Sequence, residues 1–206
     1  MATNMLPHAP WGEYVSHVGQ MTVEQFEQFP MEDGWTYELH EGRLVGMPGP
    51  GREHGSIQTK LTVPLSAYLT AHNLGTIYGT SCYNLPLPNN REELLCPDLS
   101  YVLPAREVGV QMRGSYPVLA PDLVIEIGSP RDTHPKLAQK SALYLQAGVQ
   151  LIWVVWPDSQ TIEVWLPSAL ASAPARPSVT LRGANTLDGL HVIPGFQCPV
   201  TDVFAM

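Results

Sequence analysis

The feature that most constrains the fold is a pair of nearly continuous apolar runs separated by one amphipathic helix. The runs are Leu123–Ile127 and Leu151–Trp156, and short runs of this kind are typical of strands buried on both faces of a sheet. Between them, Pro135 suits the first turn of a helix that continues to about Gln146, and Gly148 ends it. Strand, helix and strand in this order predict a crossover unit. We therefore expect an α/β domain.

Caps, turns and spacing predict the other elements. Thr22 and Gln25 have the spacing of a capping box, at the start of a short helix that Pro30 ends. Residues 56–72 carry apolar side chains at helical spacing, and we expect a kink or a break at Pro64 inside them. Glu41-Gly42 predicts a hairpin turn and Asp158-Ser159 a second one. The strands expected besides the two apolar runs are residues 35–40, 43–47, 76–87, 99–103 and 161–166.

Length and composition limit the class of protein. The chain has 206 residues, of which 44% are hydrophobic and 15% charged. This is enough apolar material for a core and argues against disorder. We expect residues 1–20 to form a poorly ordered leader and residues 21–206 to form one domain. No segment approaches the roughly 18 apolar residues of a membrane span, and the first residues lack the pattern of a secretory signal, so we expect a cytoplasmic protein.

The cysteines and the net charge exclude some kinds of site. Cys82, Cys96 and Cys198 are odd in number and widely spaced, which predicts free thiols rather than a disulfide framework or a paired metal site. The formal net charge of −8 counts against a broad basic surface for nucleic acid. It is compatible with a small basic cleft, or with carboxylates whose charge is offset by a metal ion.

Two carboxylates stand where a functional role is plausible. Glu126 lies inside the run Leu123–Ile127, and a carboxylate is costly to bury there unless it is paired or metal-bound. The alternative is a strand-end residue that faces solvent. Asp98 lies at the start of the strand expected from Leu99, where a side chain can reach a cleft. The alternative for Asp98 is an ordinary turn residue.

Lys140 is the third candidate because it falls within the apolar stripe of the helix that ends at Gly148. Its side chain can point over the sheet towards a carboxylate, or it can extend along the apolar surface to solvent. Lys136 lies one turn earlier on nearly the same line and is the rival. The sequence leaves both alternatives open.

Two carboxylates and a lysine form a chemically coherent group. Carboxylates bind Mg²⁺, for which Mn²⁺ can substitute, and the ion activates water and polarises a phosphoryl oxygen. A lysine nearby can stabilise the developing negative charge. Glu38 and His54 could add a ligand or a supporting contact, although a lone histidine near a helix start is more often structural. The chain has no phosphate-binding loop ending in GK[ST], no GxSxG and no HExxH.

A series of short motifs runs in order along nearly the whole chain after residue 20. They are Met21–Phe26, Tyr37–Leu44, Glu53–Gly55, Cys96–Ser100, Pro121–Pro130, Lys140 with Tyr144–Val149, Ile152–Val155 and Ile193–Phe196. Each piece alone is weak, but the ordered set is specific. Together these motifs resemble the Uma2 family of endonucleases, which is part of the PD-(D/E)XK nuclease superfamily.

The resemblance implies a restriction-endonuclease-like core, in which a central mixed β-sheet is flanked by helices, and Mg²⁺-dependent hydrolysis of DNA phosphodiester bonds. Asp98 would match the first acid and Glu126 the second, and both would bind the metal. The superfamily's usual lysine is absent because position 128 is Gly, and Lys140 would take its place. Glu38 and His54 would be accessory residues.

The chain departs from the family pattern at Pro64, which interrupts a helix, and at Trp156, where an Asp is expected before Pro. Two other functions therefore stay open beside the endonuclease. One is a catalytically inactive nuclease-fold domain that binds DNA or protein, for which a homodimer is one form; the negative net charge and the missing lysine favour it. The other is a metal-dependent hydrolase of a non-DNA phosphoester. Fold analogy alone does not establish function.

Overall fold

The structure is a computed structural model that describes residues 14–15, 20–88, 92–168 and 176–205. The chain divides into two compact units. Unit 1 comprises Met1–Gly49, Cys82–Cys96 and Val110–Leu119, and unit 2 comprises Pro50–Ser81, Pro97–Gly109 and Ala120–Met206. Most of the predicted leader lies outside the described residues. The single domain over residues 21–206 stays a prediction.

Unit 1 contains a five-stranded antiparallel sheet in the order β1-β3-β2-β6-β5. The predicted hairpin is confirmed, because β2 and β3 pair on either side of Glu41 and Gly42. Both turn residues have positive φ, 52° and 73°, which is the geometry that two-residue hairpin turns favour. The strands are β1 (Tyr14–Val15), β2 (Trp35–His40), β3 (Arg43–Pro48), β5 (Tyr83–Asn84) and β6 (Leu94–Leu95), and a separate pair is formed by β8 (Met112–Arg113) and β9 (Tyr116–Pro117).

The short helix α1 (Val23–Glu27) begins at the predicted capping box. The backbone N–H of Thr22 donates to Oε1 of Gln25 at 2.8 Å, and the backbone N–H of Gln25 donates back to the Thr22 hydroxyl. Val23 and Phe26 are buried and form the core of unit 1 with Leu39, Leu44 and Leu94. The cap fixes where the helix begins, and the two apolar side chains hold it on the sheet.

Cys82 and Cys96 form a disulfide in unit 1, so the prediction of three free thiols is wrong for this pair. β5 and β6 pair with Tyr83 opposite Leu95, and the next residues outward are the two cysteines, whose Cα atoms are 4.0 Å apart. Cys198 is a buried free thiol. Disulfides are rare in a reducing cytoplasm. The disulfide therefore does not favour a cytoplasmic location, which stays a prediction.

Unit 2 is built on a six-stranded mixed sheet in the order β13-β12-β11-β10-β7-β4. β10 and β11 are parallel and joined through a helix, whereas the other neighbours are antiparallel. The predicted crossover unit and the mixed sheet are thus confirmed. The strands are β4 (Ile77–Gly79), β7 (Leu99–Tyr101), β10 (Leu123–Ile127), β11 (Leu151–Trp156), β12 (Thr161–Trp165) and β13 (Val179–Arg182).

The strand expected over residues 76–87 is wrong as a single element. The chain instead forms β4 in one sheet and β5 in another. Thr80 lies between them with a φ of 39°, which is incompatible with a continuous strand. Its backbone N–H donates to the carbonyl oxygen of Asp98 at 2.9 Å, so β4 ends beside the residue that precedes β7.

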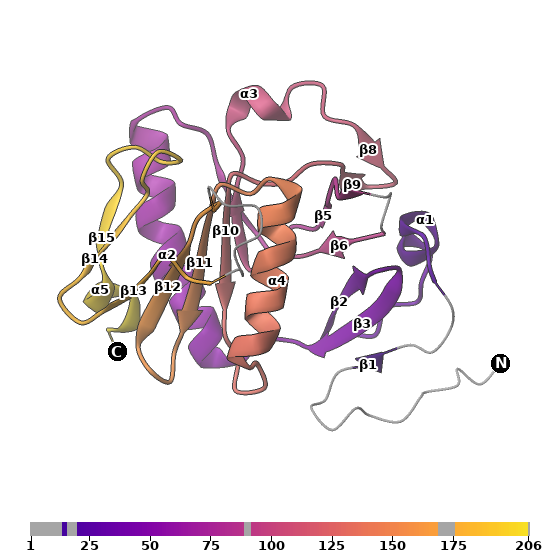
Figure 1. Ribbon diagram of the computed structural model, residues 1–206, viewed down its shortest axis with the longest axis horizontal. Helices are drawn as coiled ribbons and strands as arrows, with labels where there is room; N and C mark the ends of the chain where they lie inside the picture. The colour runs from indigo at the N-terminus through magenta and orange to yellow at the C-terminus, as the bar shows by residue number, and fades with distance from the viewer. Residues whose placement is uncertain (1–13, 16–19, 89–91, 169–175, 206) are drawn as a thin grey trace. The chain divides into compact units, whose positions relative to one another are not determined.

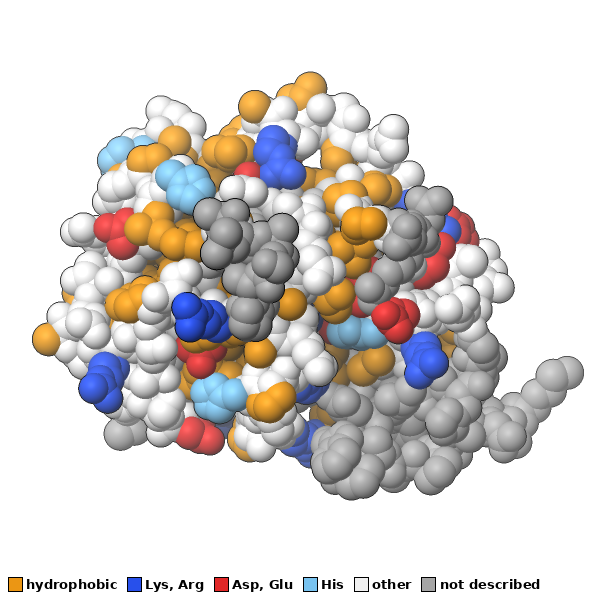
Figure 2. Space-filling model, viewed as in Figure 1, with side chains coloured by type: hydrophobic (Ala, Val, Ile, Leu, Met, Phe, Trp, Pro, Cys, Tyr) orange, Lys and Arg blue, Asp and Glu red, His pale blue; other side chains and the backbone are white. Residues whose placement is uncertain are grey.

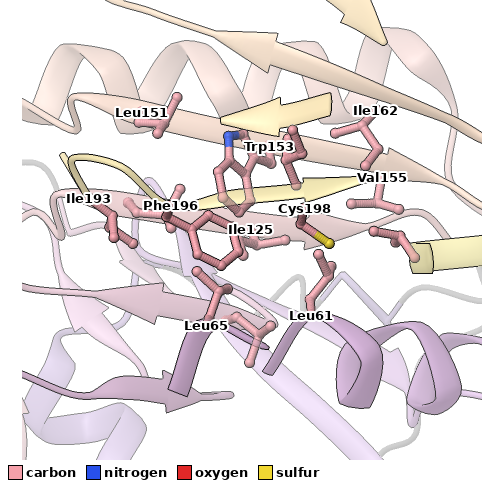
Figure 3. Packing of buried hydrophobic residues seen from close by; sticks show 14 of the residues in the cluster. Leu61, Leu65, Ile125, Leu151, Trp153, Val155, Ile162, Ile193, Phe196 and Cys198 are labelled. Carbon is pink, nitrogen blue, oxygen red and sulfur yellow. The ribbon is translucent and has the colours of Figure 1, made fainter. Parts of the chain in front are cut away.

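Helices cover both faces of the unit 2 sheet (Figure 1). α2 (Arg52–Ala71) packs on the face that carries Ile125 and Trp153, and Figure 3 shows Leu61 and Leu65 directed towards these side chains. α2 continues without a break through Pro64, so of the two expectations there the break is wrong. α4 (His134–Ala147) lies on the opposite face and begins at the Thr133 cap. It ends at Gly148, as predicted, with a φ of 108°.

The C-terminal segment completes the core on the α2 face. Phe196 and Cys198 are buried in the same apolar cluster as Trp153 (Figure 3). The remaining elements are α3 (Pro104–Glu107), β14 (Thr186–Asp188), β15 (Gln197–Pro199) and α5 (Val200–Phe204). Among the described residues, none of the helices combines the length and the apolar character that a membrane crossing needs.

Candidate functional site

Glu126 lies in β10, and Asp98 directly precedes β7, the strand that pairs antiparallel with β10 in unit 2. β7 and β10 pair with Leu99 opposite Ile125, and the same register continued by one residue sets Asp98 opposite Glu126. Side chains directly opposite each other in such a pair lie on the same face, with their Cβ atoms about 5 Å apart. The backbone N–H of Ile127 donates to Oδ2 of Asp98 at 2.7 Å, which ties the Asp98 carboxylate to β10. The two predicted acids are therefore neighbours.

The Glu126 carboxylate is buried and has partners. Only 6% of the residue is exposed, so the alternative of a solvent-facing strand end is wrong. Its Oε1 atom lies 2.9 Å from Nζ of Lys140 and accepts a 2.8 Å hydrogen bond from the hydroxyl of Tyr144. A buried carboxylate is stable only with such compensation. Glu126 thus has two polar partners inside an otherwise apolar strand.

The two rival lysines of α4 have different partners. Lys140 is buried and reaches Glu126, whereas Nζ of Lys136 lies 2.9 Å from Oδ1 of Asp132. Asp132 precedes the helix, so the one-turn offset between the lysines directs Lys136 to the helix start and Lys140 to the sheet. The geometry therefore selects Lys140 as the lysine beside the second acid. Its catalytic role stays a prediction.

His54 supports Asp98 from the first turn of α2. Its Nε2 atom lies 3.0 Å from Oδ1 of Asp98, and the residue is 8% exposed. Burial lowers the pKa of His54, but the hydrogen bond and charge of Asp98, with the charges of Glu126 and Asp132, outweigh it and leave the pKa above its ordinary value. Nδ1 is buried and has no hydrogen-bond partner among the described residues. His54 is thus held as the immediate neighbour of the first acid.

Glu38 belongs to unit 1, and it contacts two other residues of that unit. Its Oε1 atom accepts a 2.7 Å hydrogen bond from the backbone N–H of Cys96, and its Oε2 atom lies 3.0 Å from Nε2 of His40. Only 1% of the residue is exposed. The first of these contacts holds Cys96, which follows β6 and lies two residues before Asp98 in the chain. An accessory role in chemistry stays a prediction.

Position 128, where the superfamily's lysine is expected, has no room for a side chain. A Cβ atom added to Gly128 would lie 2.8 Å from Cε3 of Trp156. The Trp156 ring is held in place by His134, whose ring centroid lies 4.0 Å from its own. The missing lysine at position 128 and the departure at Trp156 therefore concern one location, and the amine near Glu126 comes from α4 instead.

Tyr144 is the site residue that the sequence did not reveal. It is fully buried, and its hydroxyl donates to the same Glu126 oxygen that Lys140 contacts. An aromatic residue on the apolar side of a helix is usually a core residue, so its identity carried no signal. Its position four residues after Lys140 could have shown that both side chains point to one place.

The donor set fits a hard divalent cation. The described residues contain no group of three His, Cys, Asp or Glu side chains placed to bind a metal. Mg²⁺, however, is commonly held by one or two carboxylates and keeps several waters. Asp98 and Glu126 supply two carboxylates on adjacent strands, which meets that requirement. Figure 2 shows Lys and Arg side chains dispersed among acidic and uncharged ones, in keeping with the net charge of −8.

Comparison with known proteins agrees with the fold. A crystal structure described as a putative nuclease belonging to DUF820, from Anabaena variabilis ATCC 29413, superposes with a TM-score of 0.73. It is 20% identical in sequence, and the match covers 90% of this chain and 98% of the other. The search of curated proteins found no match. The Uma2 family, described as putative restriction endonucleases, matches residues 23–201, and the chain belongs to this family.

Proposed function

We propose that this chain is a Mg²⁺-dependent endonuclease that hydrolyses phosphodiester bonds of DNA, with Mn²⁺ as a substitute ion. The observation that carries the proposal is the placement of Asp98 directly before β7 and of Glu126 in the neighbouring strand β10, with Lys140 2.9 Å from Glu126. Membership of a family described as putative restriction endonucleases supports DNA as the substrate. A site that holds two ions needs more ligands than a site that holds one, and two carboxylates suit a single ion.

Each residue has a role that follows from its contacts. Asp98 and Glu126 would hold the cation, which when bound polarises a phosphoryl oxygen and activates water. Lys140 would stabilise the negative charge that develops on the phosphate, because a fixed ammonium in a partly dry site interacts strongly with that charge. His54 would keep the Asp98 carboxylate in one orientation through the 3.0 Å contact to Oδ1.

The test is a titration of Mg²⁺ and Mn²⁺ against cleavage of supercoiled plasmid and of single-stranded DNA. Asp98→Asn and Glu126→Gln each remove a charged ligand with little change in shape. Asp158→Asn, in the exposed turn after β11, makes the same chemical change at a residue that is not a proposed ligand and is the matched control. We expect metal-dependent cutting by the wild type and the control, and only background cutting by the two site variants. Undiminished cutting by both site variants would refute the proposal.

A second candidate is a nuclease-fold domain that binds DNA or protein without cleavage. It is favoured by the absence of a three-ligand group among the described side chains and by the net charge of −8. This candidate predicts a DNA mobility shift that is the same in chelator and in Mg²⁺, with no product in either. Sedimentation analysis would show whether the binding form is a homodimer. Turnover of a small phosphodiester without plasmid cleavage would instead indicate a non-DNA phosphoester substrate.

A further inference from the structure

Glu126 is held by two donors that come from one helix. Lys140 and Tyr144 are four residues apart in α4, so they lie on the same side of it and one turn apart. The Lys140 ammonium is 2.9 Å from Oε1 of Glu126, and the Tyr144 hydroxyl is 2.8 Å from the same atom. The ammonium also lies 5.9 Å from the centre of the Tyr144 ring. The three side chains therefore form one buried group.

Two donors on one oxygen restrict the carboxylate more than either donor alone. Each carboxylate oxygen has about two acceptor directions, and at Oε1 both can be taken by Lys140 and Tyr144. Rotation of the carboxylate about its terminal bond would break both contacts in a buried place, where a lost hydrogen bond is expensive. Lys140 alone would not impose this restriction, because a flexible ammonium can follow either oxygen as the carboxylate turns.

We infer that Tyr144 is a positioning residue of the proposed metal site: its hydroxyl, together with Lys140, fixes Oε1 of Glu126 and so sets the orientation in which Glu126 meets a cation. This inference rests on the proposed function. It adds a residue that does not itself contact metal or DNA and that acts through Glu126. Without the hydroxyl, the Glu126 carboxylate turns towards the Lys140 ammonium, and a cation must compete with a closer ion pair.

The test uses the full chain, Mn²⁺ and two matched tyrosine variants. Tyr144→Phe removes only the hydroxyl and keeps the ring beside Lys140. Tyr101→Phe is the control, because Tyr101 is also fully buried and its hydroxyl donates to the carbonyl oxygen of Leu74 at 2.6 Å. Both changes remove one buried hydrogen bond from unit 2. The dissociation constant for Mn²⁺ is measured without DNA by electron paramagnetic resonance at one fixed pH, and unfolding midpoints are measured in parallel.

We expect Tyr144→Phe to raise the Mn²⁺ dissociation constant about 10-fold or more, as loss of a ligand-orienting contact commonly does, and Tyr101→Phe to leave it unchanged. We also expect saturating Mn²⁺ to restore DNA cleavage by Tyr144→Phe, since more metal compensates for a misoriented ligand and does not repair a fold. Wild-type affinity in Tyr144→Phe, or an equal loss in Tyr101→Phe, would overturn the inference alone. A wild-type chain that binds no Mn²⁺ would overturn the proposed metal site and this inference with it.

Discussion

The ring of Trp156 occupies the space into which a side chain at position 128 would project. A Cβ atom on Gly128 would lie 2.8 Å from Cε3 of Trp156, a distance that real Cβ contacts essentially never show, and 3.0 Å from Cζ3. Gly128 follows β10 directly and Trp156 ends the parallel strand β11. The two residues therefore meet at the same edge of the sheet, next to the strand end that carries Glu126.

This contact predicts that Gly128→Ala is destabilising. The added methyl group must displace a packed indole ring, and overpacking of this kind costs about 1–3 kcal/mol. Chemical denaturation of the variant should show a loss in that range, and Gly128→Ala should cost less in a Trp156→Leu background than in the wild type. Gly55→Ala is the control, because a Cβ atom there meets nothing within 4 Å; within α2 it should be neutral or stabilise by about 0.5–1 kcal/mol. Equal effects of the two alanines would contradict the packing argument.

The partners of the two α4 lysines predict unequal costs for their removal. Lys140→Gln leaves the buried Glu126 carboxylate without its cation, and breaking a buried pair commonly costs about 3–5 kcal/mol. Lys136→Gln breaks a pair with Asp132 that is partly exposed to water, so we expect a loss below about 1 kcal/mol. Urea unfolding of the two variants at pH 7 measures both values. A larger loss for Lys136→Gln would show that Lys140 is not the buried partner.

The disulfide predicts a stability that depends on reductant. Cys82 and Cys96 are 14 residues apart, and closing a loop of this size stabilises a fold by about 3 kcal/mol. We expect a reducing agent to lower the unfolding midpoint of the wild type and to leave that of Cys82→Ser with Cys96→Ser unchanged. The unfolded, unreduced chain should titrate with one free thiol, that of Cys198. Three free thiols in that titration would exclude the disulfide.

The lowered pKa of Asp132 predicts that the fold loses stability in acid. Burial raises its pKa, but hydrogen bonds from Lys136 and Ser129 lower it more, so the pKa of the folded protein lies below the ordinary value of 3.8. A group with a depressed pKa stabilises the fold fully at pH values above 3.8, and this contribution is lost as the pH falls through the lower folded value. Carboxyl-carbon NMR should find the depressed pKa, and Lys136→Gln should raise it. Lys60→Gln, which removes a different lysine of unit 2, should not move it.

The candidate site could be predicted because charged residues lie in otherwise apolar segments of the sequence. Glu126 in an apolar strand and Lys140 in the apolar stripe of a helix each need a partner, and they prove to be partners of each other. Asp98 had only a strand start and a family match in its favour, and the strand register places it beside Glu126. Tyr144 was missed because a buried tyrosine is indistinguishable in sequence from an ordinary core aromatic.

The sequence by itself determined the elements whose causes are local: the capping box at Thr22, the hairpin turn at Glu41-Gly42, and the strands and crossover helix between Leu123 and Trp156. These follow from contacts within a few residues along the chain. Only the tertiary structure decided which of Lys136 and Lys140 reaches Glu126, that Cys82 meets Cys96, and that Trp156 fills the space at Gly128. Those outcomes depend on strand register and on the seating of α4 over the sheet, because a shift of one residue in register turns a side chain to the other face.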